Sequence, residues 1–141
     1  MGNTQTIRKI NFEDVQIVLK NTELYLLINT LEEMDQQCLI KNTVPIHQEE
    51  SMINKYLKLG KNMRIIIYGK NCNDEKIYKK YQQLLSLGFY NVFVYPGGLF
   101  EWLLLQDIYG IEEFPTTSKQ LDVLKYKPSS VLNIMLLENG Y

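Results

Sequence analysis

The feature of this sequence that most constrains its fold is a regular alternation of strand-like and helix-like segments. The run at 65–68, Ile-Ile-Ile-Tyr, is apolar and rich in β-branched residues, as is typical of a strand buried on both faces of a parallel sheet. Similar short apolar runs occur at 24–28 and 91–95, and segments with apolar residues at the helical period occur at 11–20, 48–59, 77–85 and 99–105. This alternation predicts an α/β domain with a mainly parallel central sheet, helices on both faces and the 65–68 strand in the middle.

The length and composition of the chain favour one domain. With 141 residues, 45% of them hydrophobic, the chain can bury one core and is too short for two ordinary domains. We expect a flexible segment at 1–9, the domain at 10–110 and a C-terminal extension at 111–141 that packs on the domain. The large apolar residues of 100–110 favour burial under this extension over a patch for a partner. The apolar run at 131–137 is expected to pack back on the domain or to form a partner surface.

The charge balance argues against binding to a polyanion. The net charge is −1, from 15 basic and 16 acidic residues, so no overall field draws the protein to nucleic acid. Lys76, Lys79 and Lys80 stand at helical spacing, which is more typical of a solvated helix face than of a phosphate-binding patch. We therefore expect no nucleic-acid partner.

Cysteine and histidine usage bears on metal binding and on location. Cys38 and Cys72 lie far apart in the sequence and His47 is the only histidine, so no ligand set for a structural zinc is present and we expect no metal and no cofactor. Two isolated cysteines suit a reducing compartment. The first ten residues lack the apolar core of a secretion signal, and the apolar runs are too short to span a bilayer. These observations predict a cytoplasmic protein.

The N-terminus carries one short targeting motif. Residues 1–6, Met-Gly-Asn-Thr-Gln-Thr, fit the pattern in which Gly2 is myristoylated after removal of Met1. A single myristoyl chain gives only marginal, reversible membrane binding, and Arg8 and Lys9 are a thin second signal. A peripheral membrane contact through acylated Gly2 and an ordinary polar terminus are equally compatible with so short a motif.

A polar loop follows the strand at 65–68 and is the first place to look for function. In open α/β folds, ligands bind where the carboxyl end of a central parallel strand meets the N-terminus of a helix. Backbone amides and the helix dipole favour an anion at such a point, so the loop could take a small anion. Its residues are Gly69, Lys70, Asn71, Cys72, Asn73, Asp74 and Glu75.

The order of elements in the second half of the chain resembles the rhodanese family. A strand, the loop at 69–75, a helix, Gly88-Phe89, a strand and then 97–102, Gly-Gly-Leu-Phe-Glu-Trp, follow one another as in the C-terminal half of a rhodanese domain. The segments 27–31 and 38–46 resemble the first half more weakly, and the resemblance covers roughly residues 10–105. It implies the rhodanese-like fold and a loop that cradles an anionic substrate around a catalytic cysteine, which carries sulfur as a persulfide.

Departures from the family pattern fall on the residues that would do the chemistry. The resemblance places Gly69 where the family has its nucleophile, and glycine has no side chain to attack a sulfur donor. Asn29 and Leu31 stand in place of an acid and an arginine, and Asp74 and Glu75 would repel an incoming anion. We therefore expect a catalytically inactive binding or regulatory module with a protein partner that the sequence does not identify.

Two other functions stay open. A sulfurtransferase of the thiosulfate type could use Cys72, because Lys70 and Lys76 would lower the pKa of its thiol, although the neighbouring acids raise it and the displacement from position 69 favours a structural role. A phosphatase is disfavoured because the loop contains no arginine to clamp phosphate. His47 precedes the 48–59 helix and is interpreted as a residue of its cap region, with no triad partner.

Overall fold

Three parallel strands form the centre of the domain. The computed structural model describes residues 6–132. The strands are β1 (Tyr25–Asn29), β2 (Arg64–Tyr68) and β3 (Val92–Tyr95), in the order β1-β2-β3. Leu27 pairs with Ile66 and Ile66 with Phe93, so β2 is the middle strand, as the sequence predicts.

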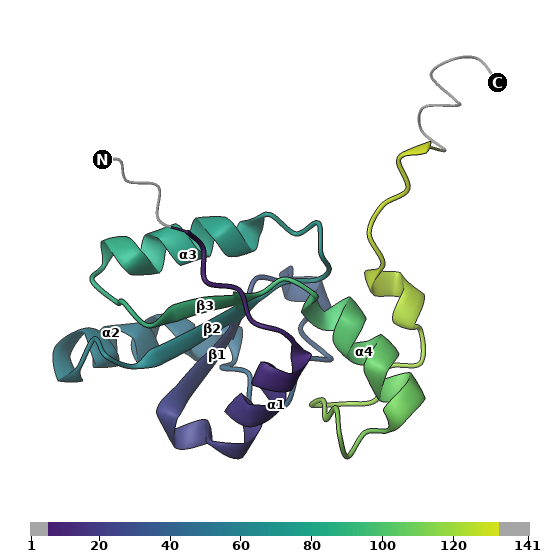
Figure 1. Ribbon diagram of the computed structural model, residues 1–141, viewed down its shortest axis with the longest axis horizontal. Coiled ribbons are helices and arrows are strands. Elements are labelled where there is room, and N and C mark those ends of the chain that lie inside the picture. Colours follow the sequence, from purple (N-terminus) through teal and green to yellow (C-terminus); the bar gives the residue numbers. More distant parts are fainter. Residues whose placement is uncertain (1–5, 133–141) are drawn as a thin grey trace.

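Within the described residues, four α-helices cover the two faces of the sheet (Figure 1). They are α1 (Phe12–Lys20), α2 (Glu49–Leu59), α3 (Lys76–Ser86) and α4 (Gly98–Tyr109). Because side chains of a strand alternate between its faces, Ile66 and Tyr68 pack with α1 and α4, whereas Ile65 and Ile67 pack with α2 and α3. The predicted α/β class, with helices on both faces of a parallel sheet, is confirmed.

Local sequence signals set several element boundaries. Asn11 and Asp14 form a reciprocal capping box, in which each side chain accepts a hydrogen bond from the other residue's backbone N–H, and α1 begins there. The segment after α3 turns at Gly88, whose φ of +105° suits a residue without a Cβ. His47 lies in a short 3-10 helix, Ile46–Gln48, directly before α2, and is exposed.

Single residues extend the sheet beyond its two edge strands. Lys9 forms a parallel bridge to Val94 of β3, and the N–H of Ile10 donates to the Val94 carbonyl at 2.8 Å. Thr43 forms a parallel bridge to Leu27 on the opposite edge. The backbone of Arg8 and Lys9 thus pairs with the open edge of β3. These two residues belong to the folded domain, although the expected boundary is at residue 10. Gly2 and the rest of the targeting motif up to Gln5 lie outside the described residues.

The chain after α4 folds back along one side of that helix. Phe114 and Tyr126 are buried in the core layer that contains Trp102, and Trp102 Nε1 donates to the Pro115 carbonyl at 3.1 Å. The other side of α4 stays exposed at Ile108, so the expected burial of 100–110 is wrong for that side. Val131 and Leu132 are exposed, and the remainder of the apolar run at 131–137 lies outside the described residues.

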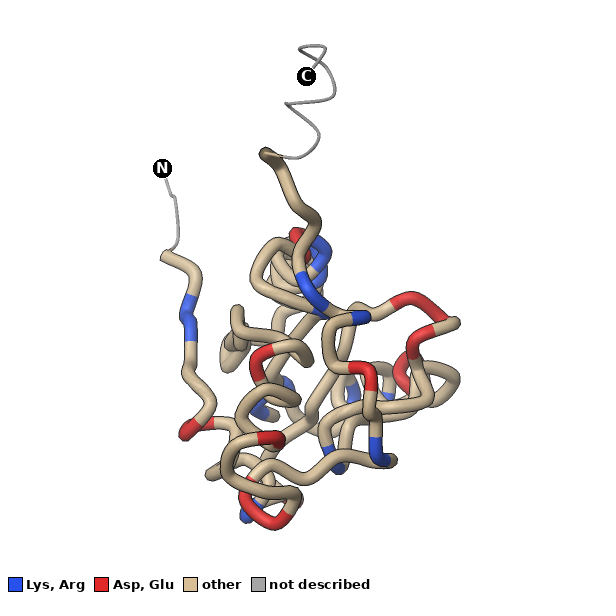
Figure 2. Tube along the Cα trace, turned by 90° about the vertical axis from the view of Figure 1, so that its right-hand side faces the viewer, with Lys and Arg blue, Asp and Glu red and all other residues tan. Residues whose placement is uncertain are grey.

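Acidic and basic positions are interspersed along the described chain (Figure 2). Within residues 6–132, no helix is long and apolar enough to cross a membrane.

Candidate functional site

The loop at 69–75 connects β2 to α3 at the carboxyl end of the middle strand. A Cβ placed on Gly98 would lie 2.8 Å from the Gly69 carbonyl oxygen and 2.9 Å from the Asn71 nitrogen, and Gly98 has a φ of +68°. This close approach lets the N–H groups of Leu99 and Phe100 donate to the carbonyls of Gly69 and Lys70, both at 2.9 Å. The first amides of α4 therefore bind the loop backbone, which requires a glycine at position 98.

The Asp74 carboxylate fills the space in front of Gly69. Its Oδ2 accepts hydrogen bonds from the Lys70 N–H at 3.1 Å and from Thr30 Oγ1 at 2.9 Å, and its Oδ1 accepts from the Lys76 N–H at 3.0 Å. A Cβ placed on Gly69 would lie 2.7 Å from Asp74 Cγ and 2.8 Å from Asp74 Cβ. The loop thus holds an anion of its own, and a side chain at position 69 would collide with it.

Asn29 and Leu31 have structural roles at the end of β1. Asn29 is buried, and its Oδ1 accepts from the Leu31 N–H at 2.9 Å and from Gln36 Nε2 at 2.7 Å. The Leu31 side chain is buried in the core layer of α1 and α4. Both residues therefore use their side chains within the fold, with Asn29 ordering the turn after β1.

The two cysteines are in contrasting environments. Cys72 is exposed, and its Sγ lies 3.8 Å from Asn73 Oδ1. The two lysines near Cys72 in the sequence pair with carboxylates instead, since Lys70 Nζ lies 3.7 Å from Asp35 and Lys76 Nζ lies 2.8 Å from Glu32. Cys38 is buried, with its Sγ 3.4 Å from the Ser118 carbonyl oxygen.

The C-terminal extension also holds the loop. Asn71 Nδ2 donates to the Tyr126 carbonyl at 2.9 Å, and Asn71 Oδ1 accepts from the Asn73 N–H at 2.9 Å. Asp35 is buried between Lys70 of the loop and Lys125 of the extension, whose Nζ lies 3.9 Å from its carboxylate. The loop conformation therefore depends on contacts from segments far away in the sequence, on both sides of the loop along the chain.

Sequence reasoning missed several contributors to this site, among them Thr30, Asp35, Gly98 and Tyr126. Thr30 and Asp35 stand 44 and 35 positions before their loop partners Asp74 and Lys70, so no local spacing links them. Gly98 belongs to the Gly-Gly motif before α4, and that motif was the one available signal of a close backbone approach. The sequence shows that position 74 is acidic, but not that the carboxylate turns into the loop.

Two tyrosines at the ends of β2 and β3 are buried beside the loop. Burial raises the pKa of Tyr68, whose Oη accepts from the Ile40 N–H at 3.1 Å and lies 2.7 Å from Thr43 Oγ1. Burial raises the pKa of Tyr95 as well, and its hydrogen bond to the Glu101 carboxylate adds to the rise. Both hydroxyls stay protonated and serve as hydrogen-bonding groups.

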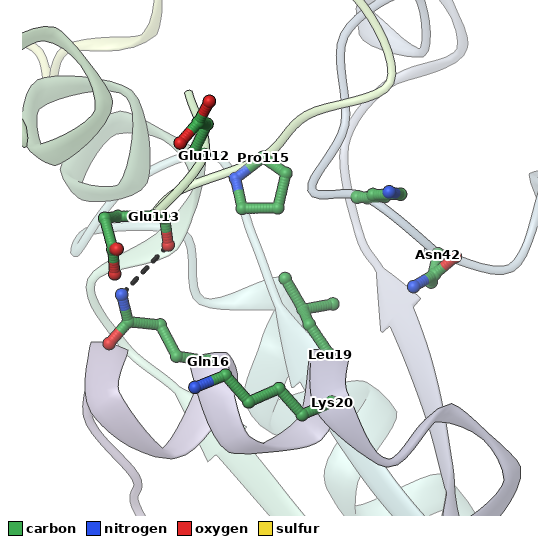
Figure 3. A pocket seen from close by; sticks show the side chains of 8 residues that line it. Gln16, Leu19, Lys20, Asn42, Glu112, Glu113 and Pro115 are labelled. Carbon is green, nitrogen blue, oxygen red and sulfur yellow. Dashed lines mark hydrogen bonds between the residues drawn. The ribbon is translucent and has the colours of Figure 1, made fainter. Parts of the chain in front are cut away.

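One surface hollow adjoins the loop and another lies away from it. A hollow of about 370 Å³ is lined by Thr30 and Lys76, which both bind Asp74, together with Asn29, Leu31, Ile46, Glu49, Lys79, Lys80 and Gln83. The pocket in Figure 3, about 290 Å³, lies between α1 and residues 112–115, where Gln16 Nε2 donates to the Glu113 carbonyl at 2.9 Å. No residue of 69–75 lines it. Among the described residues, no group of three or more His, Cys, Asp or Glu side chains could hold a metal ion.

The fold and the loop together define the class of protein. It is an α/β domain whose parallel sheet is covered on both faces and whose candidate site lies at the carboxyl edge of the sheet. The family model of the rhodanese-like domain matches residues 13–105. The chain belongs to this family.

Solved structures share the fold of this chain. The chain is similar to the Alr3790 protein of Anabaena sp., with 20% identity over 94% of each chain and a TM-score of 0.54. It is also similar to the solution structure of that protein's rhodanese-like domain, with 21% identity over 89% of this chain and 88% of that one and a TM-score of 0.56. The single-domain sulfurtransferase RDL2 of Saccharomyces cerevisiae has 18% identity over 77% of this chain and 98% of its own, with a TM-score of 0.51. No curated protein matches the chain significantly.

Proposed function

We propose that this rhodanese-like domain is catalytically inactive and acts as a binding or regulatory module. The observation that carries the proposal is the Asp74 carboxylate, which lies where a side chain at position 69 would project. Sulfur transfer requires a thiolate that attacks a sulfane donor and room for that donor beside it. Gly69 has no thiol, and the Asp74 carboxylate occupies the space that a sulfur donor would need.

The bound carboxylate also opposes entry of an anionic donor. Thiosulfate would have to displace Asp74 from the Lys70 N–H, the Thr30 hydroxyl and the Lys76 N–H. A displaced carboxylate would remain beside the donor and repel it, since like charges at close range are unfavourable. We therefore assign binding to the surface of the domain and not to a small anion in the loop.

A thiosulfate:cyanide sulfurtransferase assay tests the proposal. The wild type, Cys72→Ser and Cys38→Ala should all form thiocyanate at the rate of a protein-free blank. Cys38→Ala is the control for loss of a thiol outside the loop, because Cys38 is buried. Turnover that is retained in Cys38→Ala and lost in Cys72→Ser would overturn the proposal.

The second candidate function is sulfur transfer through Cys72, favoured by the exposure of its thiol in this loop. The Cys72 thiolate would attack the sulfane sulfur of thiosulfate, break its S–S bond and release sulfite. Cyanide would then take the sulfur as thiocyanate and return the thiolate. Alkylation by iodoacetamide at neutral pH tests it, with glutathione as the reference thiol. A Cys72 rate no higher than that of glutathione removes the mechanism, whereas a persulfide on Cys72 in mass spectra supports it.

The motif at 1–6 supports a peripheral membrane contact through myristoylated Gly2. Intact-protein mass spectrometry of material from the natural host tests this part of the proposal. Addition of one myristoyl group after loss of Met1 would support it, and an unmodified Gly2 would end it.

A further inference from the structure

A groove lined by four apolar and four polar side chains lies between α4 and the C-terminal extension, outside the site described above. Leu103 and Ile111 line it on the helix side, and Leu121 and Val123 line it on the side of the extension. Its volume is about 390 Å³, enough to accept an aliphatic side chain. We refer to it as the α4 groove.

The rim of the α4 groove carries large apolar side chains that nothing in the described chain covers. Leu121 is 84% exposed, the highest value among the large apolar residues of 6–132. Ile111, which lines the groove on the helix side, is 49% exposed. Apolar side chains gathered in one exposed patch are a mark of interaction sites.

The charges of the α4 groove complement one another. Asp107 and Lys119 both line it, and neither forms an ion pair with any residue in the described part of the chain. In a twofold dimer the same patch faces itself, so each charge of one copy can meet the opposite charge of the other. One acid and one base in the same groove satisfy this requirement.

We propose that the α4 groove is a self-association surface whose occupant is a second copy of this chain. Around a twofold axis, Leu121 of each copy enters the groove of the other, and Asp107 pairs with Lys119 across the interface in both directions. The inference does not depend on the proposed loss of sulfur transfer, because no residue of the loop at 69–75 lines this groove.

Sedimentation equilibrium of the full chain, from micromolar to near-millimolar concentration, tests the proposal. The wild type should be in monomer–dimer equilibrium, and Leu121→Asp should be monomeric throughout. Leu59→Asp is the matched control: Leu59 is 70% exposed, but it ends α2 on the opposite face of the sheet, so dimerisation should be unchanged. Circular dichroism should show the same fold in all three. A wild type that is monomeric throughout would overturn the proposal, as would a Leu121→Asp variant that dimerises as the wild type does.

A charge-exchange experiment tests the twofold arrangement. Asp107→Lys and Lys119→Asp should each weaken the dimer about tenfold at low salt, because each change places two pairs of like charges across the interface. An equimolar mixture of the two variants should recover association, since one copy then presents two bases and the other two acids. Failure of the mixture to associate better than either variant alone would overturn the proposed pairing.

Discussion

The core layers of this domain and its loop at 69–75 are held in place by different forces. In the layers, buried aliphatic and aromatic side chains pack on both faces of the sheet, and many contacts share the stabilisation. In the loop, one carboxylate and one amide, those of Asp74 and Asn71, accept or donate most of the side-chain hydrogen bonds. The scaffold therefore depends on many shared apolar contacts, whereas the loop depends on a few polar groups.

The largest expected effect is in the core layer beneath the loop. Trp102 is fully buried, packs edge-on against Phe114 with ring centroids 5.0 Å apart, and donates to the Pro115 carbonyl. Trp102→Ala should lower the free energy of unfolding by about 3–5 kcal/mol, because it leaves a cavity between α4 and the extension. Urea denaturation followed by circular dichroism measures this. If Trp102→Ala lowered the free energy of unfolding by less than the loop variants below, the core layers would not be the more strongly stabilising region.

The next effect lies at the junction of scaffold and loop. Gly98→Ala should cost about 2–4 kcal/mol, because a Cβ would press on the Gly69 carbonyl oxygen and the Asn71 nitrogen and the residue has a positive φ. Gly97→Ala should cost less, since φ there is −59° and the new Cβ would meet only the Glu101 carboxylate, which can move at the expense of its hydrogen bond from Tyr95. Urea denaturation compares the two, and equal losses would mean that the close approach at Gly98 does not constrain the loop.

Within the loop, two adjacent acids should differ. Asp74→Ala should cost about 1–3 kcal/mol, because it leaves the N–H groups of Lys70 and Lys76 and the Thr30 hydroxyl without their acceptor. Glu75→Ala should change stability by less than about 0.5 kcal/mol, because Glu75 is exposed and its side chain makes no hydrogen bond to the described residues. Urea denaturation measures both changes.

A double-mutant cycle sharpens this prediction about Asp74. Gly69→Ala alone should destabilise the protein, because its Cβ meets the Asp74 side chain. Gly69→Ala should cost less in the Asp74→Gly background, where that side chain is gone. A cost independent of residue 74 would show that the carboxylate does not occupy the space in front of position 69.

The scaffold could be predicted from the sequence because its signals are local. The runs of β-branched residues indicated the strands, and the helical period indicated the helices. The loop could not, because its geometry depends on partners far along the chain, such as Thr30 for Asp74 and Tyr126 for Asn71. Adjacent acids look alike in sequence, and only the tertiary contacts decide which one turns inward.

The smallest expected effect concerns the exposed ion pair between Lys76 and Glu32, which we call the rim of the loop. It tests whether this pair is independent of the hydrogen bonds of Asp74, the interior of the loop. Lys76 uses its backbone N–H for Asp74 and its Nζ for Glu32. The hydrogen bond and charge of Lys76 hold the pKa of the exposed Glu32 carboxyl below its ordinary value. The pair therefore stabilises the fold above that ordinary pKa, and its contribution is lost as the pH falls through the lowered one.

Lys76→Met should raise the pKa of Glu32 back towards its ordinary value while the backbone bond to Asp74 stays. Lys79→Met, on the same helix and without an ion pair in the described chain, should leave the Glu32 pKa where it is. Carboxyl titration by NMR gives the pKa, and the amide shift of residue 76 reports on the Asp74 bond. If the pKa of Glu32 did not change, the ion pair between Lys76 and Glu32 would be contradicted. If the pKa of Glu32 rose and the amide shift of residue 76 also changed, the ion pair and the Asp74 hydrogen bonds would be coupled. The loop conformation would then depend on its surface charges as well as on Asp74.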